Sequence, residues 1–302
     1  MSTENNMNKV HGFAAAIISA AAFGLIPLFS IPVLTTGISP AGVLVYRFGF
    51  GSLILLVLLM MQRQNIHLGF GESLHLTLLS LCYSMSAIFL LEGYHYLSSG
   101  IATVLMFSYP VWTAILMMLF RGEKAAPTTF IAIGCAIGGV CFLSGIDKGI
   151  GNISLVGIGL ELLSGLSYSV YMVTYPIMKI RNIPTLKVNF YIFFFTTLML
   201  MLYAVFTTGY IPMMKTGSNF INLFLLGLVP TVVSNITLIQ ALRNIGSTLV
   251  AILGAFEPLT AMCIGIIVFK EPFTKNTAIG FILILTAVTL LILKNAKQEK
   301  GS

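Results

Sequence analysis

Long runs of apolar residues, separated by short polar connections, follow one another along the whole sequence. Of the 302 residues, 57% are hydrophobic and only 8% are charged, whereas a soluble domain carries about 25% charged residues, mostly on its surface. This composition excludes a soluble globular protein, and the high hydrophobicity excludes intrinsic disorder. We therefore expect the chain to fold with the hydrocarbon of a bilayer as its main solvent.

Most of these runs are long enough to cross a bilayer as helices, which takes about 20 residues each. The runs are continuous rather than alternating, which disfavours transmembrane strands. They predict an all-α integral membrane protein with ten transmembrane helices. The predicted spans are 12–34, 40–61, 73–96, 99–120, 127–146, 154–178, 184–208, 219–242, 246–269 and 275–293. The first span is too long for a typical signal-peptide core, so we interpret it as a retained helix.

The distribution of basic residues predicts how the chain is oriented. With the N-terminus in the cytoplasm, the cytoplasmic loops and tails contain 11 Lys and Arg residues and the outer loops contain 4, while Arg47 lies within the second span. Because cytoplasmic loops carry the excess of basic residues, we expect a multi-pass protein of the inner membrane with both termini in the cytoplasm. The net charge of +7 is then an orientation signal and does not indicate a nucleic-acid partner.

The second half of the sequence repeats the first at an offset of 148 residues. At this offset Tyr109-Pro110 aligns with Glu257-Pro258, and Glu123 aligns with Glu271. Further alignments pair Ser86 with Ser234 and, more loosely, Gly12, Ser19 and Phe23 with Gly157, Ser164 and Tyr168. The predicted halves are residues 1–148 and 149–302, with five spans each, and five is odd, so the second half enters the membrane from the opposite side. Inverted repeats are frequent in transporters, whose solute sites lie near the midplane between the halves.

Several segments of both halves carry a recognisable family pattern. They are Tyr96–Ala102, Tyr109-Pro110 and Arg121–Lys124 in the first half, and Ala241–Ser247, Phe256–Leu259 and Lys270–Phe273 in the second. In these segments the chain resembles EamA-type permeases of the drug/metabolite transporter superfamily, over nearly its whole length. The resemblance implies a ten-helix carrier of the bacterial inner membrane, usually an exporter of amino acids or other small metabolites. It also implies that the third, fourth, eighth and ninth spans line a central cavity, with contributions from the first and sixth.

Ionisable residues inside a bilayer are costly and are candidates for function. Glu257 lies near the predicted midplane, where the sequence offers no basic partner at the same depth. Burial disfavours a charged carboxylate, so Glu257 could exchange a proton with a water-filled cavity, and Pro258 loosens the helix beside it. We predict that Glu257 contributes to substrate binding or proton coupling. The alternative is a protonated Glu257 that is hydrogen-bonded to a neighbouring helix.

Two interpretations remain open for the other intramembrane charges. Arg47 could form a structural ion pair with Glu92 or Glu161, or else Arg47 or Glu161 could face the cavity and meet a charged substrate. Polar and aromatic residues predicted at a similar level complete the candidate site: Tyr83, Ser86, Ser108, Tyr109, Pro110 and Trp112 in the first half, and Ser164, Tyr168, Tyr171, Ser234 and Asn235 in the second. The alternative for most of the serines and Asn235 is that they hold helices together, and the alternative for Tyr and Trp residues near the span ends is that they are interfacial anchors.

The sequence therefore predicts a secondary transporter that moves a small organic solute, such as an amino acid or a drug-like compound, by alternating access and in the direction of efflux. Protons are a candidate coupling ion, and no cofactor or metal site is expected, since no metal-ligand spacing and no catalytic motif occurs in the sequence. The alternatives are an intramembrane enzyme acting on a lipid or peptide, and a channel. Gly134-x-x-x-Gly138 predicts close helix packing, within a monomer or, alternatively, across a dimer.

Overall fold

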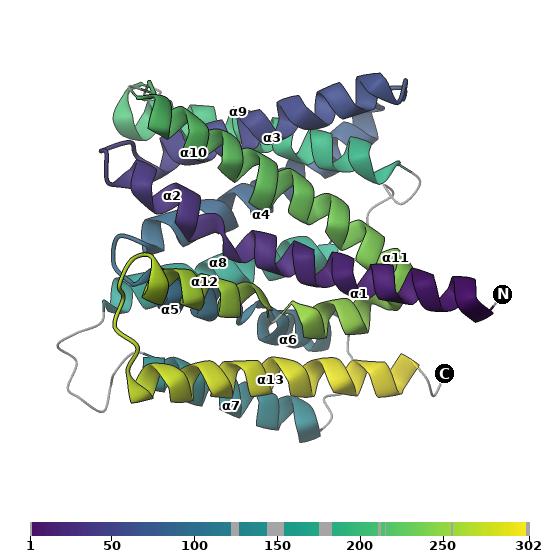
Figure 1. Ribbon diagram of the computed structural model, residues 1–302, viewed down its shortest axis with the longest axis vertical. Coiled ribbons are helices and arrows are strands. Elements are labelled where there is room, and N and C mark those ends of the chain that lie inside the picture. Colours follow the sequence, from purple (N-terminus) through teal and green to yellow (C-terminus); the bar gives the residue numbers. More distant parts are fainter. Residues whose placement is uncertain are drawn as a thin grey trace.

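The computed structural model describes residues 2–121, 127–143, 154–174, 183–210, 213–214, 216–254 and 256–299. Every regular element in these ranges is helical, as predicted (Figure 1). The elements are α1 (Ser2–Gly24), α2 (Ile26–Leu34), α3 (Pro40–Met61), α4 (Phe70–Gly93), α5 (Ser99–Met106), α6 (Tyr109–Arg121), α7 (Pro127–Leu143), α8 (Leu155–Thr174), α9 (Thr185–Thr208), α10 (Gly217–Gly227), the π-helix η3 (Leu228–Val233), α11 (Ser234–Leu253), α12 (Phe256–Ile267) and α13 (Lys275–Glu299).

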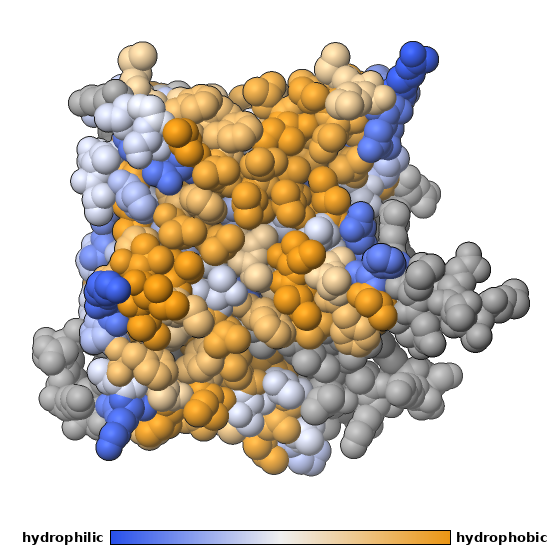
Figure 2. Space-filling view, viewed as in Figure 1, coloured by the Kyte–Doolittle hydropathy of each residue, from blue (hydrophilic) through white to orange (hydrophobic). Residues whose placement is uncertain are grey.

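Six helical stretches are long and apolar enough to cross a membrane. They are Val10–Leu34, Pro40–Met61, Phe70–Gly93, Leu155–Thr174, Thr185–Thr207 and Gly217–Leu238. Of the other four predicted spans, 99–120 and 246–269 are interrupted, 127–146 corresponds to the shorter helix α7, and 275–293 lies in α13, whose described apolar stretch is Lys275–Leu290. The number ten therefore remains a prediction. Apolar side chains cover much of the face seen in Figure 2, and the first helix starts on the same side of the molecule on which α13 ends (Figure 1).

Prolines at equivalent positions of the repeat end two helices. A proline ring clashes with the carbonyl four residues earlier, and Pro110 and Pro258 lie four residues after Met106 and Gly254. α5 ends at Met106, and α11 ends at Leu253, one residue before Gly254. The predicted spans 219–242 and 246–269 imply a loop at residues 243–245. This prediction was wrong, because α11 runs through these residues. The residues there favour a turn, but they do not break a helix as a proline does.

Each main contact between a helix of the first half and a helix of the second half has an equivalent contact in which the two halves have exchanged roles. α3 packs on its counterpart α9 and α7 packs on α13, while the pair α1 and α11 corresponds to the pair α8 and α4. Backbones approach closely at both of these exchanged crossings: Gly12 lies against Asn244 and Ile245, and Gly157 lies against Tyr96 and Leu97. The contacted residues are again separated by 148 positions, so the repeat extends to the packing. The predicted boundary at residue 148 lies outside the described residues.

The same two crossings contain equivalent serine pairs. Ser19 Oγ donates to the carbonyl of Ser234 at 2.8 Å, and Ser164 Oγ donates to the carbonyl of Ser86 at 2.8 Å. These four serines hold helices together rather than forming a polar surface. Of the four, Ser86 also reaches the cavity described below.

Glu271 connects the two halves at one end of the molecule. Its carboxylate accepts hydrogen bonds from the backbone N–H and hydroxyl of Ser99, at 2.7 and 2.8 Å, and from the N–H of Gly100 at 3.2 Å. A carboxylate stabilises the start of a helix, here α5, through its unpaired N–H groups and its dipole. The counterpart Glu123 lies outside the described residues.

Close packing of α7 on α13 depends on Gly139 rather than on the predicted pair Gly134 and Gly138. A Cβ at Gly139 would lie 2.6 Å from Ile284 Cγ1 and 3.0 Å from the carbonyl oxygen of Gly280. At Gly134 a Cβ would meet no atom within 4 Å, and at Gly138 it would make an ordinary contact of 3.8 Å.

We therefore expect Gly139→Ala to lower the free energy of unfolding by about 1–3 kcal/mol, the usual cost of overpacking. Gly134→Ala is the matched control on the same helix, and it should leave stability unchanged or raise it by up to about 1 kcal/mol through helix propensity. Thermal unfolding of both purified variants in detergent checks this prediction. Equal melting temperatures would contradict it.

Candidate functional site

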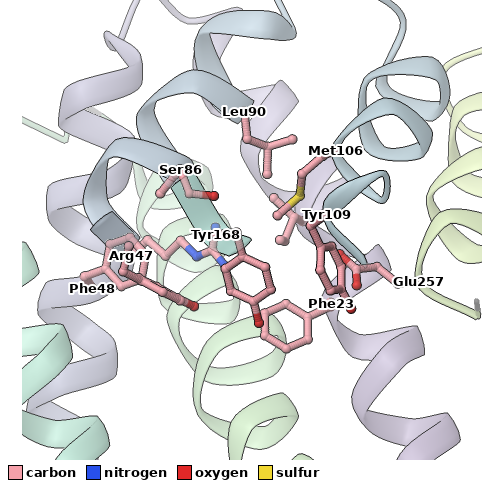
Figure 3. Close-up of a pocket in the computed structure, with 12 residues that line it drawn as sticks. Phe23, Arg47, Phe48, Ser86, Leu90, Met106, Tyr109, Tyr168 and Glu257 are labelled. Atoms are coloured by element: carbon pink, nitrogen blue, oxygen red, sulfur yellow. The ribbon is translucent and has the colours of Figure 1, made fainter. Parts of the chain in front are cut away.

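A small cavity lies between the two halves of the chain (Figure 3). Its walls come from α1 to α6 of the first half and from α8 and α12 of the second. The lining residues are Phe23, Ile26, Arg47, Phe48, Tyr83, Ser86, Ala87, Leu90, Met106, Tyr109, Tyr168 and Glu257. The cavity measures about 40 Å³, whereas one water molecule takes about 30 Å³ in the liquid. The cavity is therefore too small for an organic solute, which would need the walls to move apart.

Arg47 is the cation of this cavity. Its side chain is buried in α3, its Nε donates to Thr231 Oγ1 at 3.0 Å, and its guanidinium carbon lies 5.0 Å from the centre of the Phe48 ring. Thr231 in turn donates to the carbonyl of Leu226 at 3.0 Å, five residues earlier. Thr231 lies in the π-helix η3, an element often found at functional sites. The hydroxyl group that fixes Arg47 is therefore positioned by η3.

Glu257 is the acid of the cavity and lies in the first turn of α12. Its side chain points into the cavity beside Tyr109 (Figure 3), and it is close enough to Arg47 for an electrostatic interaction. The expectation of no basic partner was wrong, because α3 brings Arg47 to this level from the other half of the chain. Gly24 makes the approach of α1 possible, since a Cβ there would lie 2.5 Å from the carbonyl oxygen of Glu257.

Tyrosines form the aromatic wall between these two charges. Tyr168 lies at the centre, with its ring 5.0 Å from Tyr109, 6.2 Å from Tyr83 and 5.8 Å from Tyr171. Asn235 lies close enough to Tyr83 to interact with its hydroxyl group, and its amide donates to the carbonyl of Thr231 at 2.6 Å. Most of the aromatic residues named from the sequence therefore meet at one place, although Tyr171 and Asn235 stand behind the cavity wall.

Other predicted residues lie away from the cavity lining. Trp112 contacts the helix α8 at Gly165, where a Cβ would lie 3.5 Å from its ring, and Pro110 and Pro258 shape the helix starts next to Tyr109 and Glu257. Ser108 is buried, and its hydroxyl has no hydrogen-bond partner within the described part of the chain.

Glu161 is fully buried between α8 and α4 instead of facing the cavity. Both of its carboxylate oxygens lack a hydrogen-bond partner among the described residues. Arg47 bonds to Thr231, and Glu92 interacts with His95. The predicted ion pair of Arg47 with Glu92 or Glu161 is therefore wrong. Helical rise gives a residue's depth, but only the fold determines which way its side chain points.

Sequence reasoning missed Thr231, which fixes Arg47, and half of the lining residues, namely Phe23, Ile26, Phe48, Ala87, Leu90 and Met106. The repeat contained a signal for Phe23, because it aligns with Tyr168, and both line the cavity. The described residues contain no group of three or more His, Cys, Asp or Glu side chains that could hold a metal ion.

Comparisons with known proteins agree with this architecture. A family model described as the EamA-like transporter family matches the chain twice, over residues 10–145 and 155–293. A solved structure titled "Crystal structure of protein" is similar with a TM-score of 0.66 and 17% sequence identity, covering 97% of this chain and 99% of that chain. At this identity the similarity extends to the fold alone. No curated protein matches the sequence.

Proposed function

Because the chain belongs to the EamA-like transporter family of membrane proteins, we propose that it is a secondary transporter that exports a small organic solute across the cytoplasmic membrane by alternating access. The observation that carries this proposal is a small cavity between the two halves that is lined by one cation, Arg47, one acid, Glu257, and several aromatic rings. Charged groups within a membrane protein mark solute pathways.

The chemistry of the cavity favours a solute with charges of both signs. An anionic group, such as a carboxylate, fits the guanidinium of Arg47, which can donate two parallel hydrogen bonds. A cationic group, such as an amine, fits Glu257, and tyrosine rings can pack on an apolar or aromatic body. Amino acids and related amines combine these groups. Glu257 could also exchange a proton when the solute leaves, which keeps protons as the candidate coupling ion.

The repeated packing supports alternating access. Helices α4 and α8 form one crossing between the halves, and their counterparts α11 and α1 form the other. If one crossing separates while the other stays closed, the cavity opens to one side of the membrane at a time, as expected for two inverted halves. With ten spans and cytoplasmic termini, the crossing of α4 and α8 lies toward the outside of the cell.

Counterflow in proteoliposomes tests the proposal. Vesicles containing the protein are loaded with one unlabelled amino acid or amine from a panel, and the uptake of the same labelled compound is followed. We expect uptake that saturates with concentration and is stimulated by the unlabelled solute inside, with the compound recovered chemically unchanged. Vesicles without protein are the control. Flux that never saturates would favour a channel, and a converted compound would favour an intramembrane enzyme.

A further inference from the structure

Glu161 is a buried carboxyl group that the proposed transport site does not use. Its exposed fraction is 0%, and neither Oε1 nor Oε2 has a hydrogen-bond partner within the described ranges. A carboxylate buried without a partner costs several kcal/mol, so the group takes up a proton and becomes neutral instead. While α4 and α8 are packed in this way, Glu161 therefore holds a proton.

The position of Glu161 links this proton to the packing of two helices. A Cβ at Gly93 would lie 2.0 Å from Glu161 Oε1 and 2.8 Å from its carboxyl carbon, so the carboxyl group occupies the space that this glycine leaves on α4. Three residues further along α8, less than one turn away, Ser164 Oγ donates to the carbonyl of Ser86 at 2.8 Å. Glu161 thus lies inside the contact between α4 and α8 and becomes hydrated only if the two helices separate.

The other half of the chain provides an internal comparison. By the two alignments of the repeat, Glu161 corresponds to Ala16 and Gly93 corresponds to Ala241. Both alanines are buried in one apolar cluster at the crossing of α1 and α11. The two crossings therefore share their packing and their serine pairs, but only the crossing of α4 and α8 contains a titratable group at this position.

Few other titratable groups face Glu161 from the helices packed on α8. Tyr94, which follows α4, interacts with it electrostatically. The remaining groups are engaged elsewhere: Glu92 with His95, and Tyr83 and Tyr109 with Glu257 in the cavity. The described α5 contains no titratable residue. No described cation is therefore placed to neutralise an ionised Glu161 at this crossing.

We propose that Glu161 is a proton-binding residue that keeps the crossing of α4 and α8 closed while it is protonated and favours opening when it releases the proton to the outside. Opening hydrates the carboxyl group and allows it to ionise, and closing requires it to take the proton back. The proposal uses the alternating access of the proposed function, but it concerns a proton-controlled opening that is distinct from the solute site.

Distances between spin labels test this without any knowledge of the solute. In a background without the four native cysteines, labels at His95 and Val156, both exposed, report on the crossing of α4 and α8. Labels at Val10 and Asn244, also exposed, report on the alanine-containing crossing of α1 and α11.

With the protein in lipid nanodiscs, we expect the ratio of open to closed distances at the first pair to rise with pH, by at most about tenfold per pH unit for one proton. Glu161→Gln and Glu161→Met, which are both permanently neutral, should keep the short distance at every pH. Two variants are used because one could fail to fold, which thermal unfolding detects. The proposal would be overturned if the distances in the parent protein did not change with pH, or if a neutral variant still showed the change. The measurement does not depend on the solute, so it stands even if no transport is detected.

Discussion

Replacing Arg47 with lysine should reduce solute transport by about 30-fold to 150-fold, although the positive charge is kept. The guanidinium uses Nε for Thr231 and stacks on Phe48, which leaves its other N–H groups for a solute. A lysine ammonium cannot make this set of contacts. Losing one hydrogen bond between charged groups is worth about 2–3 kcal/mol, which corresponds to the stated range.

Initial rates of counterflow in proteoliposomes with equal protein content measure this effect. Arg63→Lys is the matched control, because Arg63 is an exposed arginine just after α3, away from the cavity, and the same substitution there should leave transport unchanged. Thr231→Val removes the hydroxyl that accepts from Arg47, so it should reduce transport, but by less than Arg47→Lys does. Thr231→Ser keeps the hydroxyl and should transport at the parental rate. An Arg47→Lys protein that transports at the parental rate would remove Arg47 from the solute site.

Replacing Glu257 with glutamine should reduce transport by at least about tenfold, the effect of losing one charge-assisted hydrogen bond of about 1.5 kcal/mol or more. The amide keeps the shape of the side chain but can neither balance Arg47 nor carry an exchangeable proton. If Glu257 also couples transport to protons, the remaining transport should no longer depend on an imposed pH gradient.

Glu92→Gln is the control for this second substitution. Glu92 is also on a membrane helix, but it is half-buried, interacts with His95 and lies outside the cavity lining. We expect the Glu92→Gln protein to retain the parental rate and the parental response to pH. Parental transport by the Glu257→Gln protein, with the same dependence on the pH gradient, would exclude a coupling role for Glu257.

Local sequence signals predicted most of the helices and much of the cavity. The span 40–61 matches α3 (Pro40–Met61), because Ser39-Pro40 starts the helix and a polar run ends it. Glu257 was identified by its depth and by the proline that follows it, and Tyr109 was identified as its counterpart in the repeat. Such features depend on residues close together in the sequence, or on two aligned copies of one pattern.

Contacts between distant helices could not be predicted in the same way. The bond from Arg47 to Thr231 depends on the π-helical register of η3, which shifts the direction of each later side chain. The isolated position of Glu161 depends on how α8 is rotated against α4. The depth of Glu161 in the membrane could be estimated from a rise of about 1.5 Å per residue. The direction in which its side chain points around the axis of α8 could not be.

The shared packing of the two halves gives this protein an internal standard of comparison. Residue types that are the same at both crossings indicate what the packing alone requires. They are the glycines Gly12 and Gly157 and the serines Ser19 and Ser164. Where paired positions differ, as with Tyr109 and Glu257 or Ala16 and Glu161, the two copies share their packing but not their chemistry. Within one chain, each half therefore serves as the control for what packing alone requires of the other half.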